Sequence, residues 1–201
     1  VHHCCEASEA KDKSIEMLKK VGIPSPEKRY SEYPHQLSGG MRQRVMIAMA
    51  LAQNPSLIIA DEPTTALDVT IQAQIMELMK EMKENTGVSI MLITHDMGVV
   101  AEMADKIMVM YAGMVIEYGD SKGIFKDPLH PYTKGLLASI PRKDKDIDRL
   151  YTIEGTVPTL STMPKGCRFC DRCKQAKERC KTERPGMYQH DGRSVRCFLY
   201  E

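Results

Sequence analysis

Two adjacent carboxylates, Asp61 and Glu62, follow directly on a short apolar run at residues 57–60. Four apolar residues that end in acids and a proline are typical of a fully buried strand that stops at a reactive edge. Ligands of open α/β sheets bind at the carboxyl ends of strands. A magnesium–nucleotide site needs one carboxylate to hold the metal and a second group to orient the attacking water. Asp61 and Glu62 fit these roles in that order, but two solvated acids at a strand end would give the same pattern.

A serine and two glycines, Ser38, Gly39 and Gly40, stand about twenty residues earlier, at the start of a predicted helix. Apolar residues recur at helical spacing over residues 45–52, and Asn54-Pro55 ends the helix. Ser38 occupies the N-cap position. Glycines at a helix start let backbone N–H groups approach an anion closely, and the helix dipole favours a phosphate there.

A second buried strand is predicted over residues 88–94, and it ends at His95. The residues between the two strands carry an amphipathic stripe typical of a core helix, formed by Ile71, Ile75, Leu78, Met79 and Met82. Strand, helix and strand make a βαβ unit with two parallel strands. Since parallel strands end on the same side of the sheet, Asp61, Glu62 and His95 should lie together.

The remaining pattern predicts shorter elements. A helix over residues 15–21 should end at Gly22, another should cover residues 99–104, and residues 106–111 and 114–118 should form a hairpin. His2, His3, Cys4 and Cys5 suggest a metal cluster, but the ends of chains fray, so we interpret them as terminal residues.

Composition is that of a globular domain with a small appendage. The chain has 201 residues and a formal net charge of +1, which argues against a dedicated nucleic-acid binder. The sequence contains neither an apolar run near the ~20 residues needed to cross a bilayer nor a signal peptide. Any membrane association is therefore expected through a partner. Val1 in place of a methionine suggests an incomplete or processed chain.

Four motifs in this order resemble the ATPase subunit of ABC transporters: Leu37-Ser38-Gly39-Gly40, the strand ending in Asp61 and Glu62, Ala66-Leu67-Asp68, and His95. Tyr33-Pro34-His35-Gln36, Met110-Tyr111-Ala112-Gly113 and His130-Pro131-Tyr132-Thr133 are similar to the oligopeptide/dipeptide import subunits. The resemblance implies an α/β fold of P-loop NTPase type: a parallel sheet with flanking helices, incomplete at the N-terminus, plus a small Cys-rich C-terminal extension. Residues 1–141 would form the partial ATPase domain and residues 142–201 the extension.

The same resemblance implies an ATP-hydrolysing subunit of a peptide importer, with ATP and Mg²⁺ as cofactors. It implies a head-to-tail dimer with a second ATPase subunit, permease subunits in the membrane and, indirectly, an extracytoplasmic peptide-binding protein, which places the chain peripherally at the cytoplasmic face. Asp61 would serve magnesium, Glu62 would polarise water and His95 would sense the γ-phosphate. The implied nucleotide-binding residues are Ser38, Gly39, Gly40, Gln43, Asp61 and Asp68, of which residues 38–40 would cap the partner's ATP.

One motif of the family is absent, because the sequence contains no G-x-x-x-x-G-K-[ST] loop. In the family this loop precedes the segment that the chain resembles, so we interpret the chain as a C-terminal portion that is inactive in isolation. Two alternatives stay open. One is a non-transport ABC ATPase, for which the expected long coiled coils are missing, and the other is a non-catalytic half-site or metal-sensing module.

Five cysteines cluster in the extension: Cys167, Cys170, Cys173, Cys180 and Cys197. From Arg142 onward the chain carries 14 Lys and Arg against 9 Asp and Glu. Clustered cysteines in a cytosolic protein indicate metal rather than disulfides. Cys167, Cys173, Cys180 and Cys197 match the pattern by which some peptide-import ATPases hold a [4Fe-4S] cluster, and Cys170 would be an extra thiol. Tetrahedral Cys4 zinc is the alternative.

Overall fold

The computed structural model describes residues 6–65, 67–140 and 151–201. The chain divides into two compact units, Val1–His95 and Asp96–Glu201, each of which is described by itself. The His2–Cys5 cluster, Ala66 and the charged connector at 142–149 lie outside the described residues.

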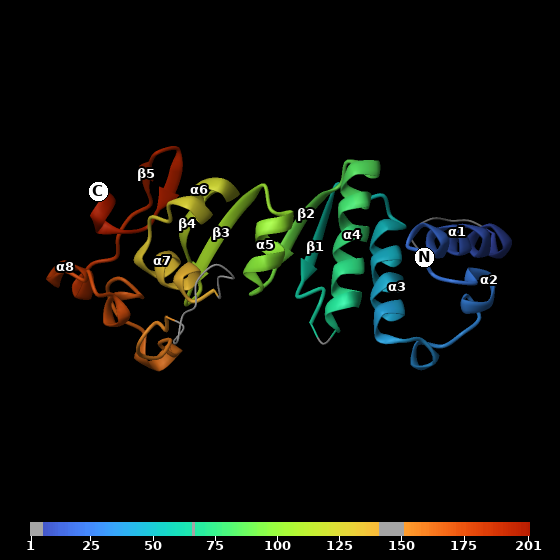
Figure 1. Ribbon diagram of the computed structural model, residues 1–201, viewed down its shortest axis with the longest axis horizontal. Coiled ribbons are helices and arrows are strands. Elements are labelled where there is room, and N and C mark those ends of the chain that lie inside the picture. The colour runs from blue at the N-terminus through green and yellow to red at the C-terminus, as the bar shows by residue number, and fades with distance from the viewer. Residues whose placement is uncertain (1–5, 66, 141–150) are drawn as a thin grey trace. The chain divides into compact units, whose positions relative to one another are not determined.

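The first unit contains a βαβ arrangement (Figure 1). Strand β1 (Leu57–Asp61) is followed by helix α4 (Val69–Thr86) and strand β2 (Ser89–Ile93). The two strands pair in parallel, from Leu57 opposite Ser89 to Asp61 opposite Ile93, which confirms the predicted parallel pairing. Helix α4 ends at Gly87, whose φ of 70° is the left-handed conformation that glycine adopts without strain.

Three helices and one 3₁₀ turn precede this arrangement in the first unit: α1 (Ala7–Lys20), α2 (Pro26–Arg29), η1 (Pro34–Gln36) and α3 (Gly39–Leu51). Helix α1 begins eight residues before the predicted range of 15–21. Its first half buries no side chain and so has no apolar stripe to detect, but Lys13 pairs with Glu9 four residues earlier, at 2.7 Å.

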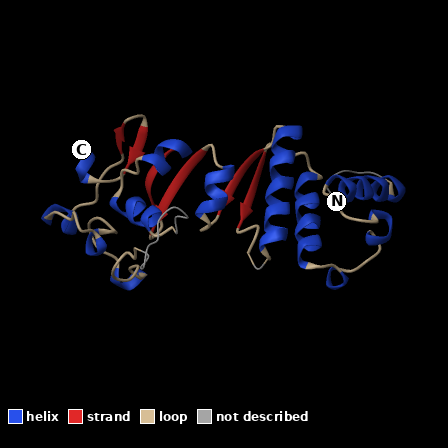
Figure 2. Ribbon diagram, viewed as in Figure 1, coloured by secondary structure: helices blue, strands red, loops and turns tan. Residues whose placement is uncertain are grey.

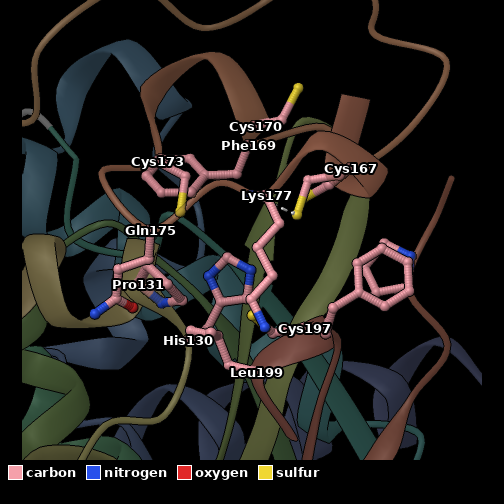
Figure 3. Close-up of a pocket in the computed structure, with 13 residues that line it drawn as sticks. His130, Pro131, Cys167, Phe169, Cys170, Cys173, Gln175, Lys177, Cys197 and Leu199 are labelled. Atoms are coloured by element: carbon pink, nitrogen blue, oxygen red, sulfur yellow. Dashed lines mark hydrogen bonds between the residues drawn. The ribbon is translucent and has the colours of Figure 1, made fainter. Parts of the chain in front are cut away.

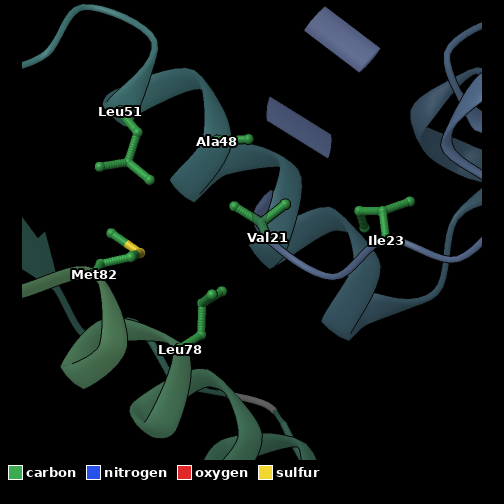
Figure 4. Close-up of a cluster of buried hydrophobic side chains, with 6 residues drawn as sticks. All are labelled: Val21, Ile23, Ala48, Leu51, Leu78 and Met82. Atoms are coloured by element: carbon green, nitrogen blue, oxygen red, sulfur yellow. The ribbon is translucent and has the colours of Figure 1, made fainter. Parts of the chain in front are cut away.

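Helices α3 and α4 pack against the loop that follows α1 (Figure 4). Val21 and Ile23 of that loop are buried, and they share one core cluster with Ala48 and Leu51 of α3 and with Leu78 and Met82 of α4. Ile58 of β1 packs against the same cluster, so this core fixes the strand relative to both helices.

We predicted that both strands are fully buried, and this prediction was wrong. Among the described residues, each strand has one exposed face. Exposure alternates along each strand, and the outward side chains are large and apolar: Leu57 is 46% exposed, Ile59 62%, Met91 49% and Ile93 47%. One side of the strand pair packs on α4, while the other side has no cover among the described residues.

The second unit is built on an antiparallel sheet (Figure 2). Its strands, in the order β3-β4-β6-β5, are β3 (Lys106–Tyr111), β4 (Met114–Asp120), β6 (Arg193–Val195) and β5 (Tyr188–His190). Strands β3 and β4 form the predicted hairpin, and the turn residues Ala112 and Gly113 both have positive φ.

Short helices and 3₁₀ turns complete this unit: α5 (Met97–Met103), α6 (Ser121–Lys126), α7 (Pro131–Ala138), η2 (Leu160–Thr162), η3 (Cys170–Arg172), α8 (Glu178–Thr182) and η4 (Phe198–Tyr200). The core combines Ile107, Val109 and Ile116 of the hairpin with Ile124 and Phe169. The C-terminal segment therefore contributes both strands and core residues to a unit that begins at Asp96. The division at 141/142 stays a prediction.

Candidate functional site

The ends of the two parallel strands bring a carboxylate and an imidazole together. His95 Nδ1 lies 2.7 Å from Glu62 Oε1, and the Glu62 backbone N–H donates to the Ile93 carbonyl at 2.9 Å. The His95 side chain is exposed and that of Glu62 is half-buried. The prediction that these two residues meet at one sheet edge is confirmed.

Glu62 is held in a strained backbone conformation. Its φ of 46° lies in the left-handed region, which is uncommon for a residue other than glycine. Its second carboxylate oxygen accepts a hydrogen bond from the Thr65 hydroxyl at 3.0 Å. The hydrogen bond from His95 is the main cause that holds the pKa of Glu62 below its usual value, and the Thr65 hydroxyl adds to it. Glu62 is thus an oriented, ionised carboxylate at neutral pH.

The two aspartates of this region have different surroundings. Asp61 is the last residue of β1 and is exposed, so its carboxylate is accessible at the sheet edge. Asp68 is the N-cap of α4, and its carboxylate accepts the Ile71 backbone N–H at 2.9 Å. Capping fixes the start of α4 and the orientation of the Asp68 side chain.

The predicted helix start at Ser38 is also confirmed. Ser38 caps α3, and its hydroxyl accepts the Met41 backbone N–H at 3.3 Å. A Cβ atom on Gly40 would lie 2.7 Å from Ile71 Cγ2, whereas one on Gly39 would lie 3.6 Å from Leu67. Gly40 therefore permits the close approach of α3 to the start of α4. Gln43 lies one turn further along α3 and is half-buried.

Five thiols line one pocket of about 370 Å³, a volume that includes space open to solvent. Figure 3 shows Cys167, Cys173 and Cys197 near His130, while the Cys170 side chain points away from it; Cys180 also lines the pocket. The Cys167 backbone N–H donates to the Cys180 carbonyl at 2.8 Å, and the Lys177 backbone N–H donates to Cys180 Sγ at 3.3 Å.

Two arginines attach the turn that carries these cysteines to the β3–β4 hairpin. Arg168 donates to the Ala112 carbonyl, and Arg172 donates to the Tyr111 hydroxyl at 3.3 Å. Arg172 also donates to the carbonyls of Ile153 and Glu154, each at 2.9 Å. The cysteine turn is thus held by the same hairpin that forms the core of the second unit.

The pKa values of the buried thiols are raised by burial and by different neighbouring groups. Burial is the main cause that raises the pKa of Cys197 to about 11, and the neighbouring thiols Cys173, Cys167 and Cys180 contribute to the same shift. Burial also raises the pKa of Cys170 to about 11, but its next causes are the hydrogen bond and the charge of Asp171. Cys167 is a further, smaller cause for Cys170, whose Sγ donates to Asp171 Oδ1 at 3.3 Å.

Over the described ranges of the chain, no group of three or more His, Cys, Asp or Glu side chains is placed to hold a single metal ion. A tetrahedral zinc site requires four ligand atoms about 2.0–2.3 Å from one point. The pocket as it stands does not have that arrangement.

His130 is a pocket residue whose part in the site the sequence reasoning missed. It is 1% exposed and lines the thiol pocket, although it precedes the first of these cysteines by more than thirty residues. His130 is the N-cap of α7 (Pro131–Ala138), and Pro131 follows it at the first helical position. Its proximity to the cysteines depends on the tertiary fold.

Two family models match separate parts of the chain. One, described as "ABC transporter", matches residues 2–65, and the other, described as "Oligopeptide/dipeptide transporter, C-terminal region", matches residues 116–180. The chain is also 55% identical over 201 residues to the oligopeptide transport ATP-binding protein AppD of Bacillus subtilis (strain 168). The chain is thus similar, over its full length, to an ATP-binding protein of the oligopeptide/dipeptide transport branch of ABC transporters.

A second relative from this branch matches over nearly the same length. The dipeptide transport ATP-binding protein DppD of Escherichia coli (strain K12) is 51% identical over 198 residues, which are 98% of this chain. The chain spans only 61% of the length of AppD and 61% of that of DppD.

Two solved ABC transporter structures share the fold of this chain over about three fifths of its length. The structure of cbiO1 from Clostridium perfringens, part of the ABC transporter complex cbiONQ, matches with a TM-score of 0.55 and 33% identity, over 63% of this chain and 49% of that one. The dimeric structure of MJ0796, a bacterial ABC transporter cassette, matches with a TM-score of 0.51 and 35% identity, over 61% and 52%. These neighbours confirm the ABC ATPase fold.

Proposed function

We propose that the full-length protein containing this chain hydrolyses ATP as the energy-coupling subunit of a peptide importer. The observation that carries this proposal is the 2.7 Å contact between His95 and Glu62 beside Asp61, at the carboxyl ends of two parallel strands. Bound Mg-ATP would supply the phosphoryl group and the metal charge that stabilises its transfer.

Glu62 is suited to orient and deprotonate the attacking water. Its carboxylate is ionised at neutral pH, and its position is fixed by His95 on one oxygen and by Thr65 on the other. A positioned base of this kind contributes about 10²–10⁴ in rate. Asp61, exposed on the same strand end, would hold magnesium, and His95 would keep Glu62 aligned and contact the γ-phosphate.

The start of α3 would complete the site of a second subunit. Ser38, Gly39 and Gly40 present backbone N–H groups at the N-terminus of a 13-residue helix, where an anion is favoured. Gln43 lies one turn beyond, and Asp68 orients the adjoining start of α4. A head-to-tail dimer would place these residues against the partner's ATP. The similar MJ0796 cassette has a dimeric structure, which supports this arrangement.

The names of the relatives support peptides as the transported class, because AppD and DppD are named for oligopeptide and dipeptide transport. The membrane partners would be permease subunits, with a peptide-binding protein outside the cell. No helix in the described ranges combines the length and apolar character that a membrane span requires. We therefore place the protein peripherally, at the cytoplasmic face.

Transport measurements test this assignment. The full-length protein, reconstituted with its permease subunits and binding protein in proteoliposomes, should take up radiolabelled peptide only with ATP. Glu62→Gln should abolish uptake, while Glu84→Gln, which changes an exposed carboxylate on α4, should not. Peptide uptake that is equal in wild type and Glu62→Gln would overturn the proposal.

The thiol pocket is a second site, and we propose that it binds a [4Fe-4S] cluster through Cys167, Cys173, Cys180 and Cys197. The soft thiolate donors suit iron–sulfur chemistry, and Cys167, Cys173 and Cys180 all contribute to the raised pKa of Cys197. In a cubane cluster each thiolate bonds its own iron, so the four sulfurs need not converge on one ion. This fits an open pocket better than zinc does.

Iron and acid-labile sulfide analysis of the anaerobically purified full-length protein tests the cluster. Each Cys→Ser variant at positions 167, 173, 180 and 197 should lose iron and sulfide, while Cys170→Ser, the matched control in the same pocket, should keep both. Stoichiometric zinc without sulfide would overturn the cluster assignment. Loss of iron and sulfide only in Cys170→Ser would show that a different set of thiols binds it.

A further inference from the structure

The second unit contains another pocket, which is lined by three arginines and is called the arginine pocket below. Its volume is about 290 Å³, which includes space open to solvent, and Arg168, Arg184 and Arg196 line it from three segments of the chain. None of these arginines lines the thiol pocket. Burial lowers the pKa of His130, which borders the arginine pocket, to about 4, so this ring is neutral at pH 7. No carboxylate is among the described residues that line the pocket, so every charged side chain there is positive.

Backbone carbonyls fix the three guanidinium groups in place. The acceptors are the carbonyl of Ala112 for Arg168, that of Lys165 for Arg184 at 3.2 Å, and those of Val115 and Pro185 for Arg196 at 2.9 and 3.2 Å. A guanidinium carries more N–H donors, in a rigid planar fork, than these contacts use. The side chains are therefore oriented by the protein while donors remain for a ligand.

The positive charges of the arginine pocket have no counter-charge from the protein. Over the described part of the second unit, the arginines that pair with carboxylates are Arg179 and Arg193, and none of the three pocket arginines does so. Arg168 and Arg196 are half-buried. Like charges gathered in one pocket repel one another, and burial strengthens the repulsion. A bound anion would remove this repulsion.

One donor of the cluster is also unsatisfied. The Nε atom of Arg168 is buried and has no hydrogen-bond partner among the described residues. Buried donors are nearly always paired, and an unpaired one is unfavourable enough to indicate a missing partner such as an ion. An anion bound at the Arg168 guanidinium would supply both an acceptor and a negative charge.

We propose that the arginine pocket binds a phosphate group through Arg168, Arg184 and Arg196. The arginine fork matches the oxygens of phosphate and of carboxylate. A phosphate monoester offers more acceptor oxygens than a carboxylate and carries about two negative charges instead of one, so it suits three guanidinium groups better. The bound phosphate would join the cysteine turn to the β3–β4 hairpin and the C-terminal segment. The inference depends on neither the iron–sulfur cluster nor the nucleotide site, whose residues belong to the first unit.

Equilibrium dialysis of the full-length protein against radiolabelled inorganic phosphate, at constant ionic strength, tests the site. Arg184→Gln is the first variant, because Arg184 is exposed and its replacement should leave the fold intact. Arg168→Lys keeps a positive charge but loses the fork and the Nε donor. Arg179→Gln removes the same charge outside the pocket, from an arginine that already pairs with Glu201, and is the matched control.

Arg184→Gln and Arg168→Lys should each weaken phosphate binding at least about tenfold, because each loses charge-assisted hydrogen bonds. Arg179→Gln should bind phosphate like the wild type. Equal affinity in the wild type, Arg184→Gln and Arg168→Lys would overturn the proposal. An equal loss in Arg179→Gln would overturn it too, because general charge attraction would then explain the binding. Acetate that competes as well as phosphate would show that the pocket prefers carboxylates.

The Nε–H resonance of Arg168 locates the ligand independently of any phosphate bound at nucleotide sites. In full-length protein labelled with ¹⁵N-arginine, this resonance is identified by its absence from Arg168→Lys, and it should shift on titration with inorganic phosphate. A titration with soluble dihexanoyl phosphatidic acid distinguishes the source of the phosphate. Tighter binding of this lipid would assign the pocket to a lipid head group, and tighter binding of inorganic phosphate would assign it to the free ion. A resonance that shifts with neither ligand would overturn the proposal.

Discussion

At the scale of single residues, the backbone conformation, the hydrogen bonds and the lowered pKa of Glu62 all favour an ionised carboxylate with a fixed orientation. Its positive φ is tolerated because the backbone N–H is bonded to Ile93 and the side chain is bonded at both oxygens. Strained backbone of this kind persists where surrounding contacts over-determine it, and it is found at functional sites. The strain directs the carboxylate at the edge where the two parallel strands end.

In the full-length protein, Glu62→Gln should still bind ATP but hydrolyse it about 10²–10⁴ times more slowly, because an amide keeps the shape and loses the proton acceptor. Nucleotide binding and phosphate release should be measured on the same preparations, with Glu84→Gln as the control. Turnover near the wild-type rate in Glu62→Gln would remove Glu62 from the role of base.

The His95 contact predicts a change in pH dependence. The hydrogen bond from His95 lowers the pKa of Glu62, so its removal in His95→Ala should raise that pKa. On acidification, the Glu62 carboxylate of the variant should then become protonated at a higher pH than in the wild type. The acid limb of kcat/KM should move to higher pH, although the remaining Thr65 bond and solvent exposure limit the shift. His35→Ala, at an exposed histidine of the first unit, should leave the limb in place. An acid limb that does not move in His95→Ala would contradict this coupling.

At the scale of elements, a single carboxylate joins β4 to the start of α7. Glu117 accepts two backbone N–H groups in a fully buried position. Glu117→Ala leaves both donors unsatisfied, and each costs about 1–3 kcal/mol. Glu117→Gln keeps one acceptor oxygen and should be destabilised less. Denaturant unfolding of the two variants gives the comparison, and equal stabilities would show that the two hydrogen bonds contribute little.

The cysteine segment depends on one close backbone approach. A Cβ on Gly166 would lie 2.7 Å from the Lys181 carbonyl carbon and closer still to the Cys180 carbonyl oxygen, whereas a Cβ on Gly186 would first meet Tyr188 at 3.8 Å. Gly166→Ala should destabilise the second unit by about 1–3 kcal/mol. The matched change Gly186→Ala should be close to neutral. Thermal unfolding distinguishes the two variants. Similar melting temperatures would mean that the α8 segment moves away from the added methyl group without a loss of folding free energy.

Periodicity and turn residues predicted several elements well. The stripe from Ile71 to Met82 predicted α4, and the Ala112–Gly113 turn predicted the β3–β4 hairpin, because both signals are local. Parallel pairing then brought Glu62 to His95. Exposure of one face of β1 and β2 was not predicted, since an apolar run does not say what covers it. The position of His130 in the thiol pocket was not predicted either, because it depends on contacts between segments far apart in the sequence.

At the scale of the whole molecule, the chain carries the residues that we propose act on water, and its sequence has no loop of the kind that grips phosphate. Asp61, Glu62 and His95 are in place, but none of the 201 residues forms a G-x-x-x-x-G-K-[ST] loop. The outward apolar side chains of β1 and β2, among them Ile59 at 62% exposure, have no cover among the described residues. Catalysis of phosphoryl transfer consists mainly of positioning and charge stabilisation, and the missing loop supplies much of both.

A polypeptide of residues 1–201 should therefore hydrolyse ATP at least about 10²-fold more slowly than the full-length protein, since the loss of even one stabilising donor costs about 10²–10³. Its MgATP binding, measured by equilibrium dialysis, should also be far weaker. Circular dichroism should first establish that the polypeptide retains helix and strand. Magnesium-dependent turnover by the folded polypeptide at the full-length rate, abolished by Glu62→Gln, would show that residues 1–201 hold a complete site and that the phosphate is gripped by groups other than the missing loop.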